Sequence, residues 1–130
     1  EFGDQQGHTP ESAQEYRNFV LTQKQSIPDL SKIAPASFSN DLVVDFLKNA
    51  KNKGVTVIGG LPTTFSDSET PPATIAYLQR LYESSGQHFV AVASGSKYDR
   101  TCFFDIAYHL NSVCQEQHSK YVVEAIRKYL

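Results

Sequence analysis

Residues 55–62, Val-Thr-Val-Ile-Gly-Gly-Leu-Pro, give the clearest indication of the fold class. The four β-branched residues are typical of a strand buried on both faces of a sheet, and the glycines and proline after them predict an open loop. Residues 89–93 form a second apolar run, which predicts another strand. A helix is predicted between the two, because Thr70-Pro71-Pro72 is followed at helical spacing by Ile75, Leu78 and Leu81. Parallel strands need such a crossover, so the order predicts an α/β fold with a small parallel sheet.

Three further helices are predicted around this unit. One begins at Thr9-Pro10 and runs to about residue 25, and another begins at Ser39 or Asn40 and stops at Gly54. The last helix follows Asn111, which we expect to be its N-cap. Apolar residues recur every three or four positions in each helix, which predicts one face in a core: Ala13, Tyr16, Phe19 and Val20; Val43, Phe46, Leu47 and Ala50; Cys114, Tyr121, Val122, Ala125, Ile126 and Tyr129.

Composition limits the classes of protein to be considered. The chain has 130 residues, of which 40% are hydrophobic, so we expect a single domain over residues 1–130, with residues 1–8 flexible. Lys and Arg number 12 against 14 Asp and Glu, and these charges are scattered, which argues against a nucleic-acid partner. No apolar run approaches the roughly 20 residues that cross a bilayer, so no membrane span is predicted in this chain.

Residues 103–111, Phe-Phe-Asp-Ile-Ala-Tyr-His-Leu-Asn, hold the candidate catalytic pair. Asp105 and His109 are four residues apart, and in the Asp-His arm of a catalytic triad the carboxylate binds Nδ1 of the imidazole, which leaves the other nitrogen basic. A structural alternative is that Asp105 caps or complements a helix start while His109 is an ordinary half-buried histidine. Tyr108 is expected in the core or in a pocket wall.

Two cysteines, Cys102 and Cys114, flank this segment. They can form a disulfide, which would indicate an oxidising compartment, or they can be two separately buried thiols. A metal site made of these cysteines with Asp105 and His109 is a further alternative, but the spacing matches none of the usual paired zinc patterns. No metal ligand is therefore predicted.

A substrate-binding edge is predicted where the first strand ends. Gly60, Thr63 and Thr64 follow that strand, and open α/β sheets bind ligands beyond the carboxyl ends of their strands. Tyr108 is added to this set as a candidate pocket residue. A tight strand-to-helix connection would explain the glycines equally well. The Walker and dinucleotide glycine patterns are missing from the sequence, so no cofactor is predicted.

The pattern Asp105-x-x-Tyr108-His109-Leu110-Asn111, after two aromatic residues and before a helix, resembles the final block of SGNH/GDSL hydrolases, particularly the branch similar to DltD-like cell-envelope proteins. Residues 51–58 followed by Pro62 resemble the helix, glycine, strand and proline loop of that branch, and Gly3-Asp4 resembles its mid-domain Gly-Asp. Two departures stand out. The chain has no Gly-Asp-Ser block, and three residues rather than two separate Asp105 from His109.

The resemblance implies a three-layer, flavodoxin-like α/β sandwich, of which this chain would be the C-terminal part of an incomplete SGNH-type domain. It also implies that Asp105 orients His109 as the base for an upstream serine, in a periplasmic or extracytoplasmic esterase or acyltransferase. The substrate would be an acyl ester, for example on an envelope polysaccharide. The alternative is a non-catalytic α/β interaction domain that binds a protein or a glycan.

Overall fold

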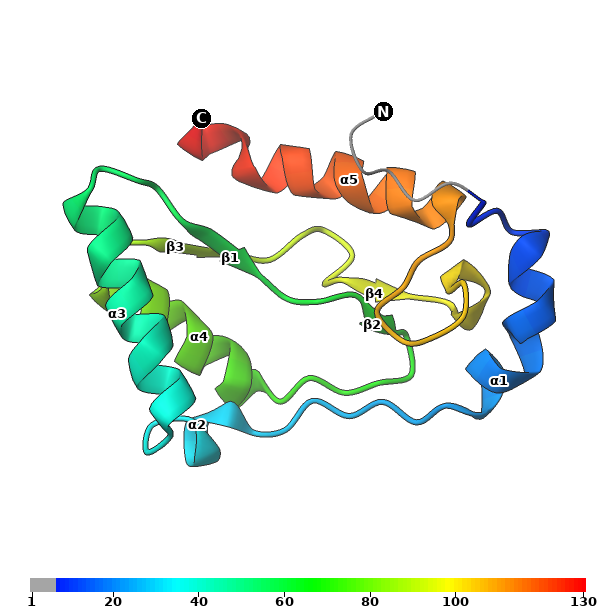
Figure 1. Cartoon of the computed structure of the whole chain (residues 1–130), viewed down its shortest axis with the longest axis horizontal. Coiled ribbons are helices and arrows are strands. Elements are labelled where there is room, and N and C mark those ends of the chain that lie inside the picture. The colour runs from blue at the N-terminus through cyan, green and yellow to red at the C-terminus, as the bar shows by residue number, and fades with distance from the viewer. Residues whose placement is uncertain (1–6) are drawn as a thin grey trace. The chain divides into compact units, whose positions relative to one another are not determined.

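The computed structural model describes residues 7–130 and has mixed α/β structure (Figure 1). Its α-helices are α1 (Arg17–Thr22), α2 (Leu30–Ile33), α3 (Phe38–Asn52), α4 (Pro72–Ser84) and α5 (Ser112–Ile126). The strands are β1 (Ile58–Gly60), β2 (Thr64–Phe65), β3 (His88–Val90) and β4 (Lys97–Tyr98), and 3₁₀ helices cover Ser12–Tyr16, Arg100–Cys102 and Arg127–Tyr129. The predicted α/β class is confirmed at this level. The predicted Gly3-Asp4 similarity and most of the segment expected to be flexible lie outside the described residues.

The chain divides into two compact units. The first unit comprises the residues up to Gln25, Leu61–Ser68 and Val92–Leu130. The second unit comprises Ser26–Gly60 and Glu69–Ala91. Each unit holds one of the two parallel strand pairs.

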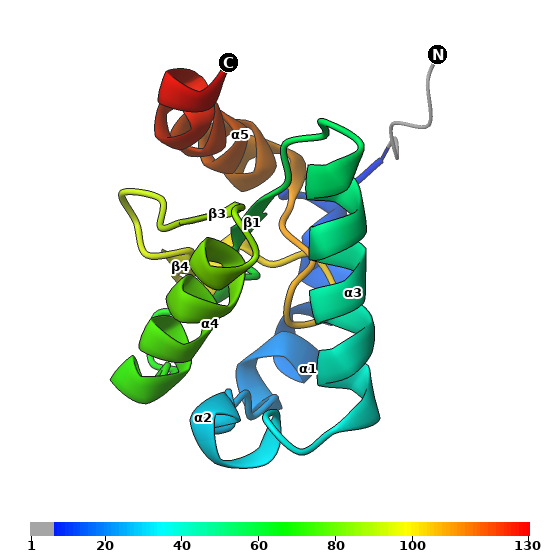
Figure 2. The same cartoon turned by 90° about the vertical axis from the view of Figure 1, so that its left-hand side faces the viewer.

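The second unit is built on β1, α4 and β3, in the order that the sequence predicts. β1 and β3 are parallel, with Ile58 opposite His88 and Gly60 opposite Val90, and α4 packs against β3. Gly59 has a packing role in this arrangement, because a Cβ atom added there would lie 2.6 Å from the Tyr82 hydroxyl. Figure 2 shows α2 near the N-terminal ends of α3 and α4, and α4 contacts both helices.

The strand predicted at residues 55–58 begins later in the sequence, at Ile58. Only Ile58 of that run belongs to β1, and Val55 is exposed rather than buried on two faces. The cause is the buried side chain of Gln87, which accepts the Val57 N–H at 2.8 Å and donates to the carbonyls of Leu47 and Val55. The Gln87 side chain therefore binds backbone groups of Val55 and Val57 that a neighbouring strand would otherwise bind.

The starts of two predicted helices also need correction. Ser37, rather than Ser39 or Asn40, caps α3, since its hydroxyl accepts the Asn40 N–H at 3.2 Å. The single helix predicted from residue 10 to 25 is a 3₁₀ helix followed by the short α1, with Phe19 exposed. The chain is extended at Gln23. The cause is that the side chains of Gln23 and Gln25 accept the N–H groups of Ala107 and Phe65, which are distant in sequence.

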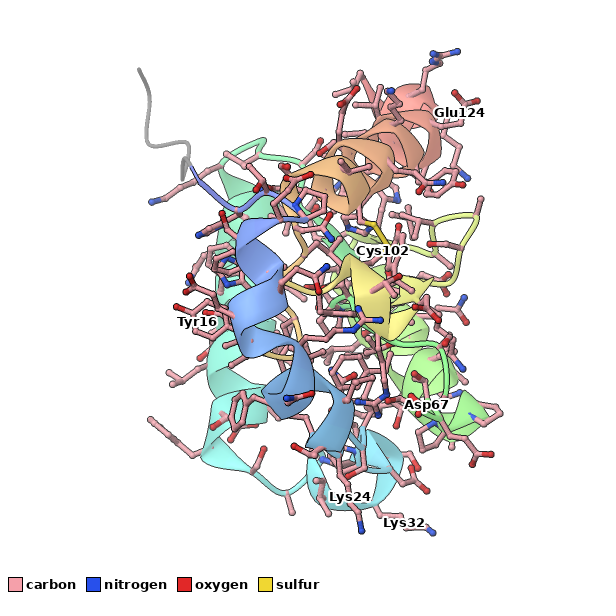
Figure 3. All side chains as sticks on the ribbon, turned by 90° about the vertical axis from the view of Figure 1, so that its right-hand side faces the viewer. Tyr16, Lys24, Lys32, Asp67, Cys102 and Glu124 are labelled. Carbon is pink, nitrogen blue, oxygen red and sulfur yellow. A yellow bond between two sulfur atoms is a disulfide. The ribbon has the colours of Figure 1, made fainter. Side chains whose placement is uncertain are left out.

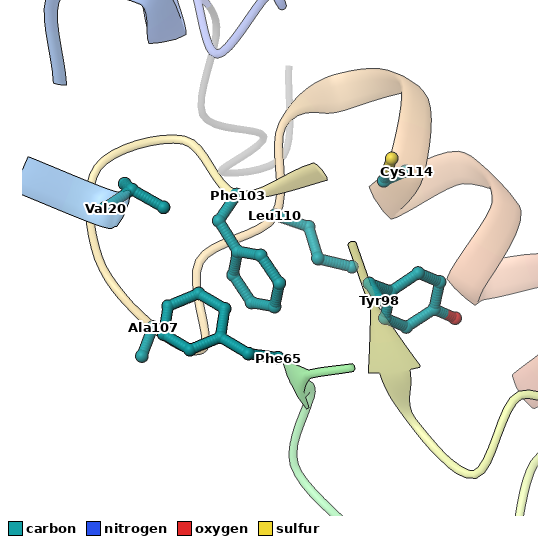
Figure 4. Close-up of a cluster of buried hydrophobic side chains, with 7 residues drawn as sticks. All are labelled: Val20, Phe65, Tyr98, Phe103, Ala107, Leu110 and Cys114. Atoms are coloured by element: carbon teal, nitrogen blue, oxygen red, sulfur yellow. The ribbon is translucent and has the colours of Figure 1, made fainter. Parts of the chain in front are cut away.

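The first unit contains the main apolar core, which Figure 4 shows: Val20, Phe65, Tyr98, Phe103, Ala107, Leu110 and Cys114. The rings of Phe65 and Phe103 meet edge to face with centroids 4.6 Å apart. β2 and β4 pair in parallel inside segments that the sequence predicts as loops. The pairing rests on Thr64 and Ser66, whose N–H groups donate to the carbonyls of Ser96 and Tyr98 at 2.8 Å each. Two-residue strands carry too little alternation to be recognised from sequence.

The last helix follows the prediction closely. The Asn111 side chain accepts the Cys114 N–H at 3.1 Å, which confirms Asn111 as the N-cap of α5. The predicted apolar stripe of α5 is less buried than expected, since Cys114 alone is buried and the later members are half-buried. Among the described residues, no helix combines the length and apolar character needed to cross a membrane.

Candidate functional site

The candidate site is the loop between Phe103 and Asn111 in the first unit. Asp105 Oδ1 lies 2.7 Å from His109 Nδ1, and each side chain is 31% exposed. An ionised carboxylate only accepts hydrogen bonds, so the Nδ1 that faces Asp105 carries a proton. The structure thus brings together the two residues that the sequence predicts as a catalytic arm. Asp105 caps no helix, because Asn111 fills that position for α5.

Short-range backbone bonds shape the loop around this pair. Phe103 and Leu110 form an antiparallel bridge, and the Phe104 N–H donates to the His109 carbonyl at 2.8 Å. Tyr108 has φ +78°, in the left-handed region that residues other than glycine rarely adopt. Backbone strain of this kind persists only where the surroundings hold the chain in place, and it is common at functional sites. Here it falls on the residue directly before His109.

The side chain of Gln23, which is distant in sequence, binds the backbone of this loop. Its Oε1 accepts the Ala107 N–H at 2.8 Å, and its Nε2 donates to the Asp105 carbonyl at 3.3 Å. One amide thus binds the backbone on both sides of Ile106. The Thr63 hydroxyl adds a third bond, to the Tyr108 carbonyl, at 3.2 Å. These two side chains fix the backbone at both ends of the segment that carries the pair.

The ends of the loop are closed by a disulfide between Cys102 and Cys114, whose Cα atoms are 5.5 Å apart (Figure 3). Asn111 reinforces this closure, because its N–H donates to the Cys102 carbonyl at 2.8 Å and its Nδ2 donates to the Thr101 carbonyl at 2.9 Å. With both sulfurs bonded to each other, no thiolate is available at Cys102 or Cys114 to bind a metal. No cluster of metal-ligating side chains occurs within residues 7–130.

Aromatic rings surround His109. The His8 ring lies at right angles to it, with centroids 4.3 Å apart, and Phe104 lies beside it at 5.6 Å. His8 also contacts Phe104 at 4.3 Å, and Tyr16 contacts Phe104 at 5.4 Å. The backbone of His8 is fixed because its carbonyl accepts the Ser112 N–H at 2.7 Å. These rings restrict the orientation of the His109 imidazole.

The predicted substrate-binding residues have different environments. Thr63 and Thr64 are both buried, Thr63 in its bond to Tyr108 and Thr64 in β2, so both support the structure. Tyr108 is 54% exposed, rather than in the core, and its side chain is accessible to a ligand. Gly60 lies in β1 and belongs to the second unit, whereas Asp105 and His109 belong to the first.

A second histidine of the first unit has a hydrogen-bonded partner that the sequence did not indicate. His118 Nδ1 lies 2.9 Å from the Tyr98 hydroxyl, and the Ser94 hydroxyl donates to that Tyr98 oxygen at 3.1 Å. Burial lowers the pKa of His118, which favours the neutral imidazole as acceptor for Tyr98. The chain Ser94, Tyr98, His118 links β4 and the loop before it to α5.

Sequence reasoning missed Gln23 and His8 as parts of the site. Both lie more than 80 positions from the residues that they contact, and neither belongs to a motif. No family model, curated protein or solved structure matches the chain. A carboxylate that fixes an imidazole, as in this loop, can support general-base or nucleophilic catalysis on an acyl group.

Proposed function

We propose that Asp105 and His109 form the base arm of an SGNH-type serine esterase or acyltransferase. The observation that carries the proposal is the 2.7 Å contact between Asp105 Oδ1 and His109 Nδ1, in a loop held by Gln23, Thr63 and the disulfide. A loop so constrained keeps an acid and a base in one orientation, which is what proton transfer in a transition state requires. An ordinary surface ion pair needs none of these supports.

In this proposal Asp105 selects the tautomer and orientation of His109, and His109 removes the proton of a serine hydroxyl that attacks the acyl carbon. That serine belongs to the Gly-Asp-Ser block of the family, which these 130 residues do not contain. The fold would be the flavodoxin-like sandwich of SGNH proteins, and the acyl ester would belong to an envelope polysaccharide. The disulfide supports an extracytoplasmic location, since such bonds persist in oxidising compartments.

An activated ester tests the pair without the serine, because an imidazole can attack p-nitrophenyl acetate directly. We expect the protein to release p-nitrophenol in proportion to its concentration, and His109→Ala to remove most of that rate. Asp105→Asn should lower the rate by roughly tenfold or more, because a misoriented imidazole is a poor catalyst. His88→Ala, in the second unit, is the matched control and should leave the rate unchanged. Equal rates for wild type and His109→Ala would overturn the proposal.

A binding function is the second candidate, and one observation favours it. α3 exposes Phe38, Leu42 and Phe46, at 76%, 53% and 60%, at a spacing of four residues that places them on one face. Exposed apolar faces of this kind mark interaction sites, and aromatic rings suit a glycan. Titration of the ¹⁵N-labelled protein with a neutral oligosaccharide should then shift the amide signals of α3. If the α3 amide signals did not shift at the highest oligosaccharide concentration, a glycan would be ruled out as the ligand of this face.

A further inference from the structure

The second unit contains a cavity that the proposed catalytic pair does not use. It has a volume of about 570 Å³, and its lining residues come from α2, α3, α4 and the connection between α2 and α3. Small-molecule sites have volumes of roughly 300–1,000 Å³ and are mostly apolar, with a few polar groups that set orientation. The volume of this cavity falls within that range, so its lining decides which ligand it can take.

Most of the cavity wall is aliphatic. Leu30 of α2, Val43 of α3, and Leu78 and Leu81 of α4 all line it. Val43 is 39% exposed, which is a large exposure for an apolar side chain in a hollow of this size. An apolar ligand would remove this surface from water, at roughly 25 cal/mol for each Å² buried.

One side of the cavity is polar and uncharged. The Tyr77 hydroxyl donates to Asn40 Oδ1, and both residues line the cavity. This bond occupies the carbonyl end of the Asn40 amide, so its NH₂ end can donate to a ligand oxygen. Burial, together with the negative charge of Asp41, raises the pKa of Tyr77, which keeps the phenol neutral.

Charge decides the class of ligand. All the lining residues are described by the structure, and none of them is Asp, Glu, Lys, Arg or His. A carboxylate would find no cation inside the cavity and would meet the field of Asp41 beside Tyr77. Arg80 lines a smaller hollow, which shares Asn40, Tyr77 and Leu81 with this cavity.

We propose that the cavity between α2, α3 and α4 binds a small neutral apolar molecule that carries one hydroxyl or carbonyl group. The apolar part contacts Leu30, Leu78 and Leu81, and the oxygen accepts a hydrogen bond from Asn40. This site is independent of Asp105 and His109, so it stands whether or not the protein acts on esters.

Two probes with the same aliphatic chain, 1-octanol and octanoate, test the proposal by titration of the ¹⁵N-labelled protein. We expect 1-octanol to give saturable shifts centred on residues 30–43 and 77–82, and octanoate to bind at least about tenfold more weakly, the equivalent of about 1.4 kcal/mol. Asn40→Ala should weaken 1-octanol binding about threefold to tenfold, because one hydrogen bond is lost.

Two variants distinguish binding of 1-octanol inside the cavity from nonspecific binding to exposed apolar residues. Leu78→Trp should fill the cavity and abolish the shifts, whereas Val113→Ala, at an exposed apolar residue of α5 outside the lining, should leave the affinity unchanged. Because Leu78→Trp can disturb folding, the wild-type shift map and Asn40→Ala serve as independent readouts. Shifts that do not saturate, or that are lost in Val113→Ala, would overturn the site. If octanoate bound as tightly as 1-octanol, the assignment of a neutral ligand would be overturned. Loss of octanoate binding in Arg80→Gln would show that Arg80 binds the carboxylate.

Discussion

Gln23 Oε1 accepts the Ala107 N–H at 2.8 Å, and this bond joins the extended chain after α1 to the loop that carries Asp105 and His109. The same side chain donates to the Asp105 carbonyl, so it binds the loop at two points. Gln25, two residues along, has a comparable role at a different place, since its Oε1 accepts the Phe65 N–H at 2.8 Å. The two glutamines therefore provide a matched pair for mutation.

Gln23→Ala should lower the free energy of unfolding by about 1–3 kcal/mol, because the buried Ala107 N–H loses its acceptor. Gln25→Ala should cost a similar amount through Phe65. Only Gln23→Ala should also change the ring ¹H and ¹⁵N signals of His109 and lower the rate with p-nitrophenyl acetate. If both variants moved the His109 signals equally, the role of Gln23 would be general stability rather than positioning.

Asp105→Asn should change the tautomer of His109 with little effect on folding. The pair is 31% exposed on each side, so its loss should cost less than about 1 kcal/mol of stability. Long-range ¹H–¹⁵N spectra at a pH where the ring is neutral report which nitrogen carries the proton. We expect the Nδ1–H form in the wild type and a mixture in the variant. A wild-type spectrum dominated by Nε2–H would contradict the arrangement described here.

The Asn111 side chain makes two hydrogen bonds, the cap of α5 and a bond to the Thr101 carbonyl, and mutation can separate their contributions. Asn111→Ala removes the acceptor for the Cys114 N–H and the donor to the Thr101 carbonyl, and should cost roughly 1–3 kcal/mol in urea unfolding. Asn111→Asp keeps the cap and loses only the donor, so it should cost less. An equal loss for Asp and for Ala would show that the bond to Thr101, rather than the cap, is the important one.

Reduction of the disulfide should loosen the loop that holds the pair. The Cys102–Cys114 bond encloses a short loop, and a closure of this length contributes about 3 kcal/mol by restricting the unfolded chain. Treatment with a dithiol, or the double substitution of both cysteines by alanine, should lower stability by about that amount. It should also speed hydrogen exchange of the Phe104 and His109 amides. Unchanged exchange at these amides would show that Gln23 and Thr63 hold the loop without the disulfide.

Stability should decrease in mild acid because of His118. Its pKa is lowered in the fold by burial, so the unfolded chain binds more protons as the pH falls below the ordinary histidine value of about 6.5. This contribution is complete above that value and is lost as the pH falls toward the lowered pKa. Urea unfolding at pH 7.5 and 5.5 should show a smaller acid loss in His118→Gln than in the wild type. His88→Gln is the control, and an equal change in both variants would exclude His118 as the cause.

Features that depend on neighbouring residues could be predicted from the sequence. Asn111 was recognisable as a cap because a short polar side chain in front of an apolar helix satisfies the free N–H groups of the first turn. The order strand, helix, strand was recognisable from the change between apolar runs and helical spacing, and β1 and β3 are parallel as that order requires. Asp105 and His109 were recognisable as a pair because only three residues separate them.

Features that depend on contacts between distant residues could be seen only in the folded chain. The displacement of β1 from residue 55 to Ile58 is caused by Gln87, and the end of α1 by bonds from Gln23 to a loop more than 80 residues away. β2 and β4 exist because Thr64 and Ser66 find carbonyls at Ser96 and Tyr98. A glutamine or a two-residue strand has no local pattern, since its conformation is fixed by hydrogen bonds that form only when the chain has folded.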